Sequence, residues 1–209
     1  MTRASDLAVA LRPAIADDRV LAAIATIPRE RFVPESERRR AYENVALPIA
    51  CGQTISQPLV VARMLELLEL TPRDLVLDVG TGSGYHAALL ALLAREVFTI
   101  ERHSELSQLA RKAIGELELD NVHYFVGDGW DGLPDHAPFD AINVAAATGA
   151  DLPEALEHQL AAGGRLVAPV GESSQNLTLV RQTESGLARE TLEGVRFVPL
   201  VRDPGDGAQ

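Results

Sequence analysis

The hydrophobic positions of the chain change their spacing twice along its length. Near the start, Leu21, Ile24 and Ile27 recur at helical intervals, and a second helical pattern covers Pro58 to Leu70. Proline suits the first turn of a helix, because it lacks the N–H group that would stay unpaired there. The pattern predicts an N-terminal helical segment, residues 1–70.

From Leu75 onward, short runs rich in valine, isoleucine and leucine alternate with helical stretches. This alternation predicts an α/β fold, a doubly wound and mostly parallel sheet with helices on both faces, formed by residues 71–209. Ligands of such sheets bind at the carboxyl ends of the strands. The predicted strands are Leu75–Val79, Val97–Glu101, Val122–Val126, Phe139–Val144 and Arg165–Val170, and the predicted helices are Tyr85–Ala94, Glu105–Leu117 and Pro153–Leu160.

After Val170 the pattern changes again, to strand-like runs separated by polar turns. The runs are Leu177–Arg181, Leu187–Leu192 and Val195–Val201, and they predict an antiparallel C-terminal edge of the sheet. The tail from Asp203 to Gln209 lacks an apolar pattern and is expected to be frayed.

Composition narrows the classes of partner. The net charge is −11, and the only basic cluster is the short run Arg38–Arg40, which disfavours nucleic acid as a partner. The longest apolar run, Ala87–Ala94, is far below the roughly 18 residues of a membrane span, so no membrane association is expected. A single cysteine, Cys51, cannot form an intrachain disulfide, and a cytoplasmic location is predicted.

A glycine-rich turn follows the first predicted strand. Its glycines permit a tight turn and let a ligand approach the backbone closely. Their spacing, G-x-G-x-G, differs from the dinucleotide fingerprint G-x-G-x-x-G and favours S-adenosylmethionine over NAD. Considered alone, the turn is as consistent with a structural strand-to-helix connection. The candidate cofactor residues here are Asp78, Gly80, Thr81, Gly82, Ser83 and Gly84.

Two acidic residues lie at or just after the ends of the next two predicted strands. Glu101 lies about 20 residues after Gly80, the interval of an acidic group that accepts hydrogen bonds from a ribose diol. Asp128, beside Gly129, is suited to accept from an exocyclic adenine amine. The alternatives are a solvated strand-end carboxylate for Glu101 and a surface turn for Asp128.

Leu47 to Pro58 has no helical period and is rich in small hydroxyl and amide side chains. One interpretation is an N-cap loop, with Ser56 or Gln57 at the start of the next helix. The run, continued by Val60 to Leu68, also resembles the signature of bacterial protein-L-isoaspartate O-methyltransferases. The resemblance extends to Ile27–Val33, Tyr42–Asn44, the glycine loop, Gly127–Trp130, Ala137–Ile142, Gln159–Leu160, Gly163–Gly171 and Val195–Val201, nearly the whole chain.

This resemblance implies a Rossmann-like, class I S-adenosylmethionine-dependent methyltransferase. It implies methyl transfer to the free α-carboxylate of isoaspartyl residues in damaged proteins, which starts repair through a succinimide. The implied partners are isoaspartyl peptides and damaged proteins, and the enzyme is expected to be a monomer that needs no metal.

The resemblance also implies roles for single residues. Ser56 lies where the family has its active-site serine, and Thr54 and Ile55 flank cofactor and substrate. The glycine loop would hold the methionine part of the cofactor. The ribose falls to Glu101 with Arg102 beside it, and the adenine to Asp128 and Gly129.

Some positions depart from the family pattern. His86 stands where bacterial relatives commonly have glutamine, and the pair Ala50-Cys51 and the segment Asn143–Ala145 also differ. His86 is interpreted either as a general base or, as we favour, as a residue that contacts solvent or caps a backbone group. Cys51 is interpreted as a packed small residue rather than a nucleophile. The remaining histidines show no metal-ligand spacing.

Two other functions stay open from the sequence. One is methyl transfer to a different acceptor, either a small molecule or a macromolecule. The other is a non-catalytic module that only binds S-adenosylmethionine, for which loss of the Ser56 segment would be expected, whereas that segment is intact.

Overall fold

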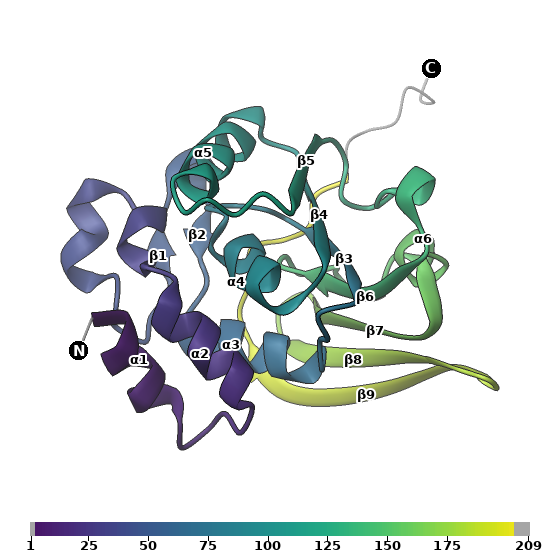
Figure 1. Ribbon diagram of the computed structural model, residues 1–209. Coiled ribbons are helices and arrows are strands. Elements are labelled where there is room, and N and C mark those ends of the chain that lie inside the picture. The colour runs from purple at the N-terminus through teal and green to yellow at the C-terminus, as the bar shows by residue number, and fades with distance from the viewer. Residues whose placement is uncertain (1–2, 203–209) are drawn as a thin grey trace.

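The computed structural model describes residues 3–202 of the chain. Its centre is a seven-stranded sheet (Figure 1). Its strands lie in the order β5-β4-β3-β6-β7-β8-β9. The first five are parallel to one another, and β7, β8 and β9 pair antiparallel, so the predicted fold class is confirmed. The strands are β3 (Leu75–Val79), β4 (Glu96–Glu101), β5 (Val122–Val126), β6 (Phe139–Val144), β7 (Leu160–Val170), β8 (Gln175–Thr183) and β9 (Gly186–Val195).

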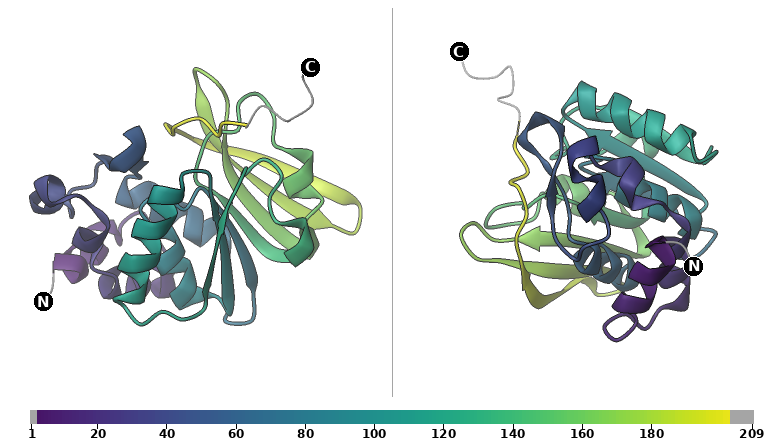
Figure 2. Two further views of the ribbon diagram at one scale, coloured as in Figure 1. Left: turned by 90° about the horizontal axis from the view of Figure 1, so that it is seen from above. Right: turned by 90° about the vertical axis from the view of Figure 1, so that its left-hand side faces the viewer.

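The helices cover the two faces of this sheet unequally. The N-terminal helices pack on α4, on one side of the sheet (Figures 1 and 2). The opposite side is covered by the short α6 and by a single 3-10 turn, η4. The helices are α1 (Arg3–Leu11), α2 (Asp18–Thr26), α3 (Pro58–Leu67), α4 (Tyr85–Leu93), α5 (Ser104–Gly115) and α6 (Glu154–Glu157), with 3-10 helices η1 (Arg29–Phe32), η2 (Glu35–Arg40), η3 (Ala50–Gly52) and η4 (Pro134–His136).

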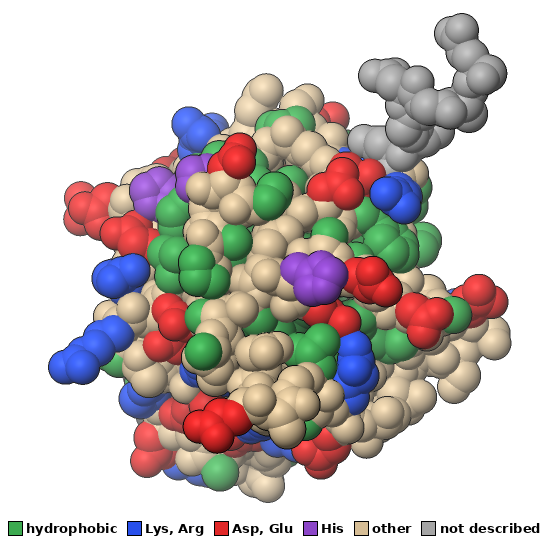
Figure 3. Space-filling view, turned by 90° about the vertical axis from the view of Figure 1, so that its right-hand side faces the viewer, with side chains coloured by type: hydrophobic (Ala, Val, Ile, Leu, Met, Phe, Trp, Pro, Cys, Tyr) green, Lys and Arg blue, Asp and Glu red, His purple; other side chains and the backbone are tan. Residues whose placement is uncertain are grey.

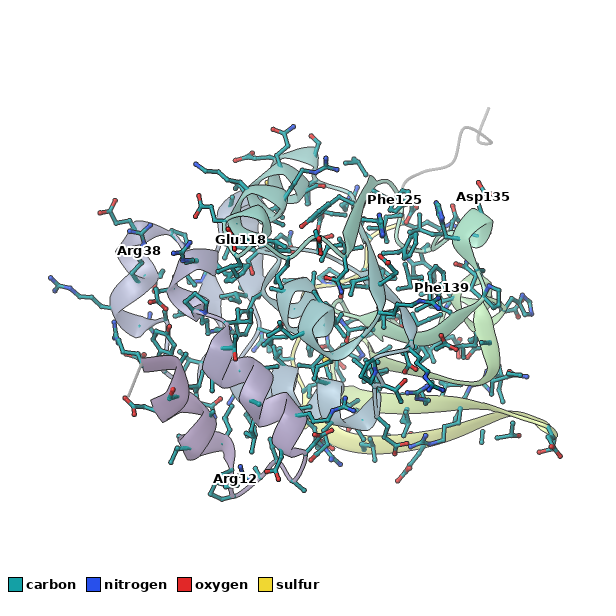
Figure 4. All side chains as sticks on the ribbon, in the orientation of Figure 1. Arg12, Arg38, Glu118, Phe125, Asp135 and Phe139 are labelled. Carbon is teal, nitrogen blue, oxygen red and sulfur yellow. The ribbon has the colours of Figure 1, made fainter. Side chains whose placement is uncertain are left out.

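Alternation along the strands divides the buried side chains into two cores. Val76 faces the core that contains α2, α3 and α4, whereas its neighbour Leu77 faces the core beneath α6. The second core is rich in aromatic rings, since Phe98 stacks on Phe125 and meets Phe139 edge-on. Figure 4 labels Phe125 and Phe139 on the side of the molecule away from the N-terminal helices.

Several element boundaries differ from the predictions. The predicted helix Pro153–Leu160 is wrong in its extent, because α6 ends at Glu157 and β7 already begins at Leu160. Leu160 is opposite Phe139 on β6, so it must be extended. The small residues that follow, including Gly163 with φ of 75°, accommodate a register shift and let β7 start five residues before the predicted strand.

The predicted strand Val195–Val201 is also wrong, since β9 ends at Val195. Beyond it the chain leaves the ladder. The side-chain amide of Gln175 accepts from the Phe197 N–H and donates to the Phe197 carbonyl. Further along, the Ala147 N–H donates to the Val198 carbonyl, and the Leu200 N–H donates to the Ala147 carbonyl. The segment 196–201 therefore crosses to the end of β6.

In the N-terminal segment, the helix predicted around Leu21 is α2, whereas α1 was not predicted. The second predicted helix, α3, ends at Leu67, before the predicted Leu70. There the guanidinium of Arg165 donates to the carbonyls of Leu68 and Glu69, which occupies acceptors at the helix end.

The surface of the described residues mixes charges of both signs. On the face shown in Figure 3, Lys and Arg side chains stand apart from one another among acidic and apolar ones. Within residues 3–202, no helix has both the length and the apolar character needed to cross a membrane. The tail 203–209, predicted to be frayed, lies outside the described residues.

Candidate functional site

The topology brings the ends of β3 and β6 together at one edge of the sheet. From β3 the chain proceeds outward through β4 and β5, and it then returns to place β6 on the other side of β3. Such a reversal leaves a crevice at the carboxyl ends of the two strands. A pocket lies there, with Gly80 after β3 and Ala145 after β6 in its wall.

The glycine loop and Glu101 form one side of this pocket. Gly82 takes φ of 53°, and its N–H donates to Glu101 Oε2 at 2.9 Å, while Oε1 accepts from the His103 N–H at 3.0 Å. Each carboxylate oxygen has two acceptor positions, so each keeps one beyond its backbone bond. A ribose diol offers two donors, and the 7% exposed Glu101 carboxylate in the pocket wall fits that demand.

The turn after β5 contributes backbone more than side chain. Gly129 lies in the pocket wall, and a Cβ atom there would stand 2.6 Å from Val79 Cγ1, so the close approach of the turn to β3 requires glycine. Asp128 accepts from the Trp130 N–H at 2.9 Å and is not among the lining residues. The Trp130 indole N–H donates to the Leu200 carbonyl, which fixes the segment 196–201 against this turn.

The opposite side of the pocket comes from the N-terminal segment. Strands β1 (Leu47–Pro48) and β2 (Thr54–Ile55) pair antiparallel, with Ile55 buried in the core and Thr54 on the outer side. Helix α3 begins two residues after Ser56, and Asn44 Oδ1 accepts from the Leu59 N–H at 2.9 Å. Asn44 thus caps the helix, and no side-chain cap comes from Gln57. The N-cap interpretation is confirmed in position, because Gln57 is the N-cap residue of α3, but its side chain makes no cap bond. Ser56 lines the pocket.

A second, wider hollow adjoins the first. The two hollows share Thr54, Ser56, Ala145 and Val198 in their walls. The second extends between β2, the turn after β7 and the end of β9, with polar side chains such as Gln57, Ser174 and Arg196 along it. Ser56 therefore stands at the junction of an inner pocket and an outer groove.

A buried polar network lies beneath the glycine loop. Asp78 is fully buried, and its carboxylate accepts from Asn143 Nδ2 at 2.7 Å and from Thr99 Oγ1 at 2.8 Å. Because Thr99 donates to Asp78, the hydroxyl of Thr81, 2.6 Å away, donates to Thr99. Burial is the main cause that raises the Asp78 pKa to about 6, against these hydrogen bonds, which lower it.

This elevated pKa predicts a pH dependence of stability. Since folded Asp78 binds its proton more tightly than the unfolded chain, its contribution to stability is greatest below pH 4 and is lost as the pH rises through about 6. A shift of this size corresponds to roughly 3 kcal/mol. In the wild type, the free energy of urea unfolding should fall by this amount between pH 4 and pH 6. In the Asp78→Asn variant, this fall should be absent. The exposed Asp135 (Figure 4) gives the control Asp135→Asn, and equal pH profiles for both variants would disprove the assignment.

The structure brings most predicted site residues into one pocket. Of the predicted set, Thr54, Ile55, Ser56, Gly80, Thr81, Gly82, Ser83, Glu101, Arg102 and Gly129 line it, whereas Asp78, Gly84 and Asp128 do not. Asp78 is connected to the glycine loop through the hydroxyls of Thr99 and Thr81. A Cβ on Gly84 would meet Ala110 Cβ of α5 at 2.8 Å. Gly84 thus permits close packing of α4 on α5.

Other pocket residues were not predicted. Val198 to Val201 form a wall that the sequence pattern assigned to a sheet edge. His86, interpreted as facing solvent or capping a backbone group, is buried, and burial lowers its pKa to about 3. The interpretation that His86 contacts solvent is therefore wrong. A side chain with so low a pKa is also a poor general base.

Cys51 likewise differs from its interpretation as a packed residue. It is exposed, with φ of 56° in the turn between β1 and β2, and its Sγ lies 3.7 Å from Glu105 Oε2. Across residues 3–202, no group of three or more histidine, cysteine or acidic side chains is arranged to hold a metal ion.

The chain is similar to known methyltransferases over nearly its whole length. The model of the family protein-L-isoaspartate(D-aspartate) O-methyltransferase matches residues 4–205. The protein-L-isoaspartate O-methyltransferase of Koribacter versatilis (strain Ellin345) is 55% identical over 192 residues, 91% of this chain and 86% of that protein. The enzyme of the same name from Serratia proteamaculans (strain 568) is 52% identical over 188 residues, 90% of each chain.

A solved structure shares the fold. It is described as a putative protein-L-isoaspartate O-methyltransferase from Plasmodium falciparum in complex with S-adenosyl-L-homocysteine. The TM-score is 0.85 at 27% identity, with 97% of this chain and 100% of that chain covered.

Proposed function

The chain belongs to the protein-L-isoaspartate(D-aspartate) O-methyltransferase family, and we propose that it transfers the methyl group of S-adenosylmethionine to the free α-carboxylate of isoaspartyl residues in damaged proteins. The observation that carries this proposal is the position of Ser56 between two hollows. The inner pocket has the glycine loop and Glu101 for a nucleoside, and the outer groove has room and polar groups for a peptide.

In this proposal each site residue has one task. Glu101 holds the ribose diol, Arg102 lies beside it, and Thr81, Ser83 and the loop backbone surround the methionine part. The adenine would lie beside the backbone of Gly129 in the pocket wall. When bound, S-adenosylmethionine supplies a methyl group on a positively charged sulfur, which provides its own driving force. The protein therefore has to align the acceptor and exclude water.

Ser56 aligns the acceptor. An α-carboxyl group with a pKa of about 3.5 is ionised near neutral pH, so the nucleophile needs no base. The Ser56 hydroxyl donates to one carboxylate oxygen and leaves the other free to attack. In the resulting methyl ester, the nitrogen of the following residue attacks the ester carbonyl and methanol leaves. The succinimide so formed hydrolyses in part to normal aspartate.

The decisive experiment is transfer of labelled methyl groups to a peptide with one isoaspartyl residue, beside its normal aspartyl twin. We expect transfer to the isoaspartyl peptide alone, with a single-turnover rate that is nearly flat from about pH 6 to pH 8. Acceptors that must lose a proton would give a rate that rises with pH. Equal labelling of the twin, or no labelling of either peptide, would exclude the proposed substrate.

The remaining parts of the proposal concern organisation. We treat residues 1–70 as the segment that supplies Ser56 and one side of the groove, and residues 71–209 as the part that binds the cofactor and supplies the other side of the groove. We further propose a monomer that works in the cytoplasm. A single species with a mass close to that of one chain, 22.4 kDa, in light scattering would support the monomer.

A further inference from the structure

The network beneath the glycine loop dictates where protons lie. An ionised carboxylate only accepts hydrogen bonds, so the group that Asn143 directs at Asp78 must be its amide nitrogen. The same nitrogen lies 3.3 Å from His86 Nδ1. With one hydrogen used on Asp78, Asn143 offers its second hydrogen to Nδ1, which must accept it. The imidazole proton of neutral His86 is then on Nε2.

This Nε2–H group has no partner within the described protein. His86 is 7% exposed, and Nε2 is buried without a hydrogen bond. A buried donor left unpaired destabilises the folded protein. Since His86 also lines the inner pocket that contains Ser56, an acceptor atom of a ligand in that pocket can remove this cost.

The charged residues of the pocket wall decide which kind of donor a bound carboxylate meets there. Among the described lining residues, the only Lys or Arg is Arg102, which follows Glu101 on the ribose side. On the inner-pocket side, a carboxylate near Ser56 therefore meets neutral donors, whereas Arg196 lies along the outer groove. Neutral donors hold a carboxylate without the strong ground-state stabilisation that an ion pair would give to a nucleophile. Burial lowers the His86 pKa to about 3, so the ring stays neutral at neutral pH.

We propose that His86, held in its Nε2–H form by Asn143 and Asp78, is a binding residue that donates a hydrogen bond to a carboxylate in the inner pocket. The inference rests on the proposed function, in which two carboxylates reach this pocket. One is the α-carboxylate of the isoaspartyl substrate, and the other belongs to the methionine part of the cofactor.

The test compares His86→Leu with His86→Gln. Glutamine keeps both groups, since its oxygen can accept from Asn143 and its nitrogen can donate into the pocket, whereas leucine has neither. His158 is exposed near the end of α6, so His158→Leu is the matched control. Thermal unfolding first establishes that each variant is folded.

Binding and kinetics distinguish the two carboxylates. Calorimetry measures adenosylhomocysteine, which has the carboxylate, and 5′-methylthioadenosine, which lacks it. If His86 holds the cofactor carboxylate, His86→Leu lowers the affinity for adenosylhomocysteine by about 10-fold or more and leaves the affinity for 5′-methylthioadenosine unchanged. If His86 holds the substrate, both affinities stay intact and kcat/KM for the isoaspartyl peptide falls by a similar factor. In either case His86→Gln stays within a few fold of the wild type.

The proposal is overturned if folded His86→Leu matches the wild type in all three measurements, or if His86→Gln fails as badly as leucine. Nitrogen-15 NMR of the wild-type imidazole supplies a separate test, because a proton on Nδ1 instead of Nε2 contradicts the network. A wild-type protein that binds adenosylhomocysteine but leaves isoaspartyl peptides unmethylated would instead refute the proposed function, while the calorimetric comparison still tests His86.

Discussion

Replacing Glu101 by alanine is expected to weaken the binding of adenosylhomocysteine by about 10- to 150-fold, which corresponds to about 1.5–3 kcal/mol. The variant loses charge-assisted hydrogen bonds to the ribose diol. It also removes the acceptor that holds the N–H groups of Gly82 and His103, so the loop itself is less well fixed. Isothermal calorimetry measures the loss directly.

The control is Glu190→Ala, which removes an exposed carboxylate on β9. It should bind adenosylhomocysteine as tightly as the wild type. Unfolding in the absence of ligand separates loosening of the loop from loss of the diol contact. A Glu101→Ala protein with unchanged affinity would remove Glu101 from the cofactor site.

The second large effect is expected from Ser56→Ala, with a single-turnover methyl-transfer rate reduced by about 10- to 150-fold at saturating peptide. The hydroxyl is proposed to orient the acceptor carboxylate, and Asn44 rather than Ser56 caps α3. Helix α3 and cofactor affinity should therefore be preserved. Rapid-quench measurement is needed, because steady-state turnover can report product release.

Ser36→Ala serves as the matched control, since Ser36 is an exposed residue of η2. Its rate and its affinity for adenosylhomocysteine should equal those of the wild type. If Ser56→Ala lowered cofactor affinity as much as it lowered the rate, Ser56 would be a cofactor contact and its assigned role would be wrong.

The sheet core was predictable because each strand carries its own pattern. β3, β5 and β6 have the bounds that their apolar runs predict, and the glycine loop and Glu101 follow at strand ends. α1 was missed although Ala4, Leu7 and Leu11 form an apolar stripe, so a signal existed. The burial of His86 was also within reach, because the apolar residues that follow it predict a helix buried on all sides.

Other features depend on contacts between distant residues. Nothing near Leu59 indicates that Asn44 caps its helix, and nothing near Leu68 indicates that Arg165 occupies its carbonyl. Local pattern also gave a β-strand for Val195–Val201, whereas tertiary contacts decide its course. The Asn44 contact fixes the start of α3, just after Ser56, and the segment 196–201 supplies one wall of the pocket.

The two hydrogen bonds between the Gln175 side chain and the Phe197 backbone matter for chimeras in which segments are exchanged between related enzymes. One side-chain amide, donating and accepting, takes the place of a peptide unit and aims the chain toward Ala147. The course of the pocket wall is thus encoded on β8, ahead of the wall itself. A chimera that takes residues 196–201 from a relative but lacks Gln175 has the side chains of the segment without the hydrogen bonds that fix the course of its backbone. The unit that must be grafted intact is the whole stretch from β8 to the wall.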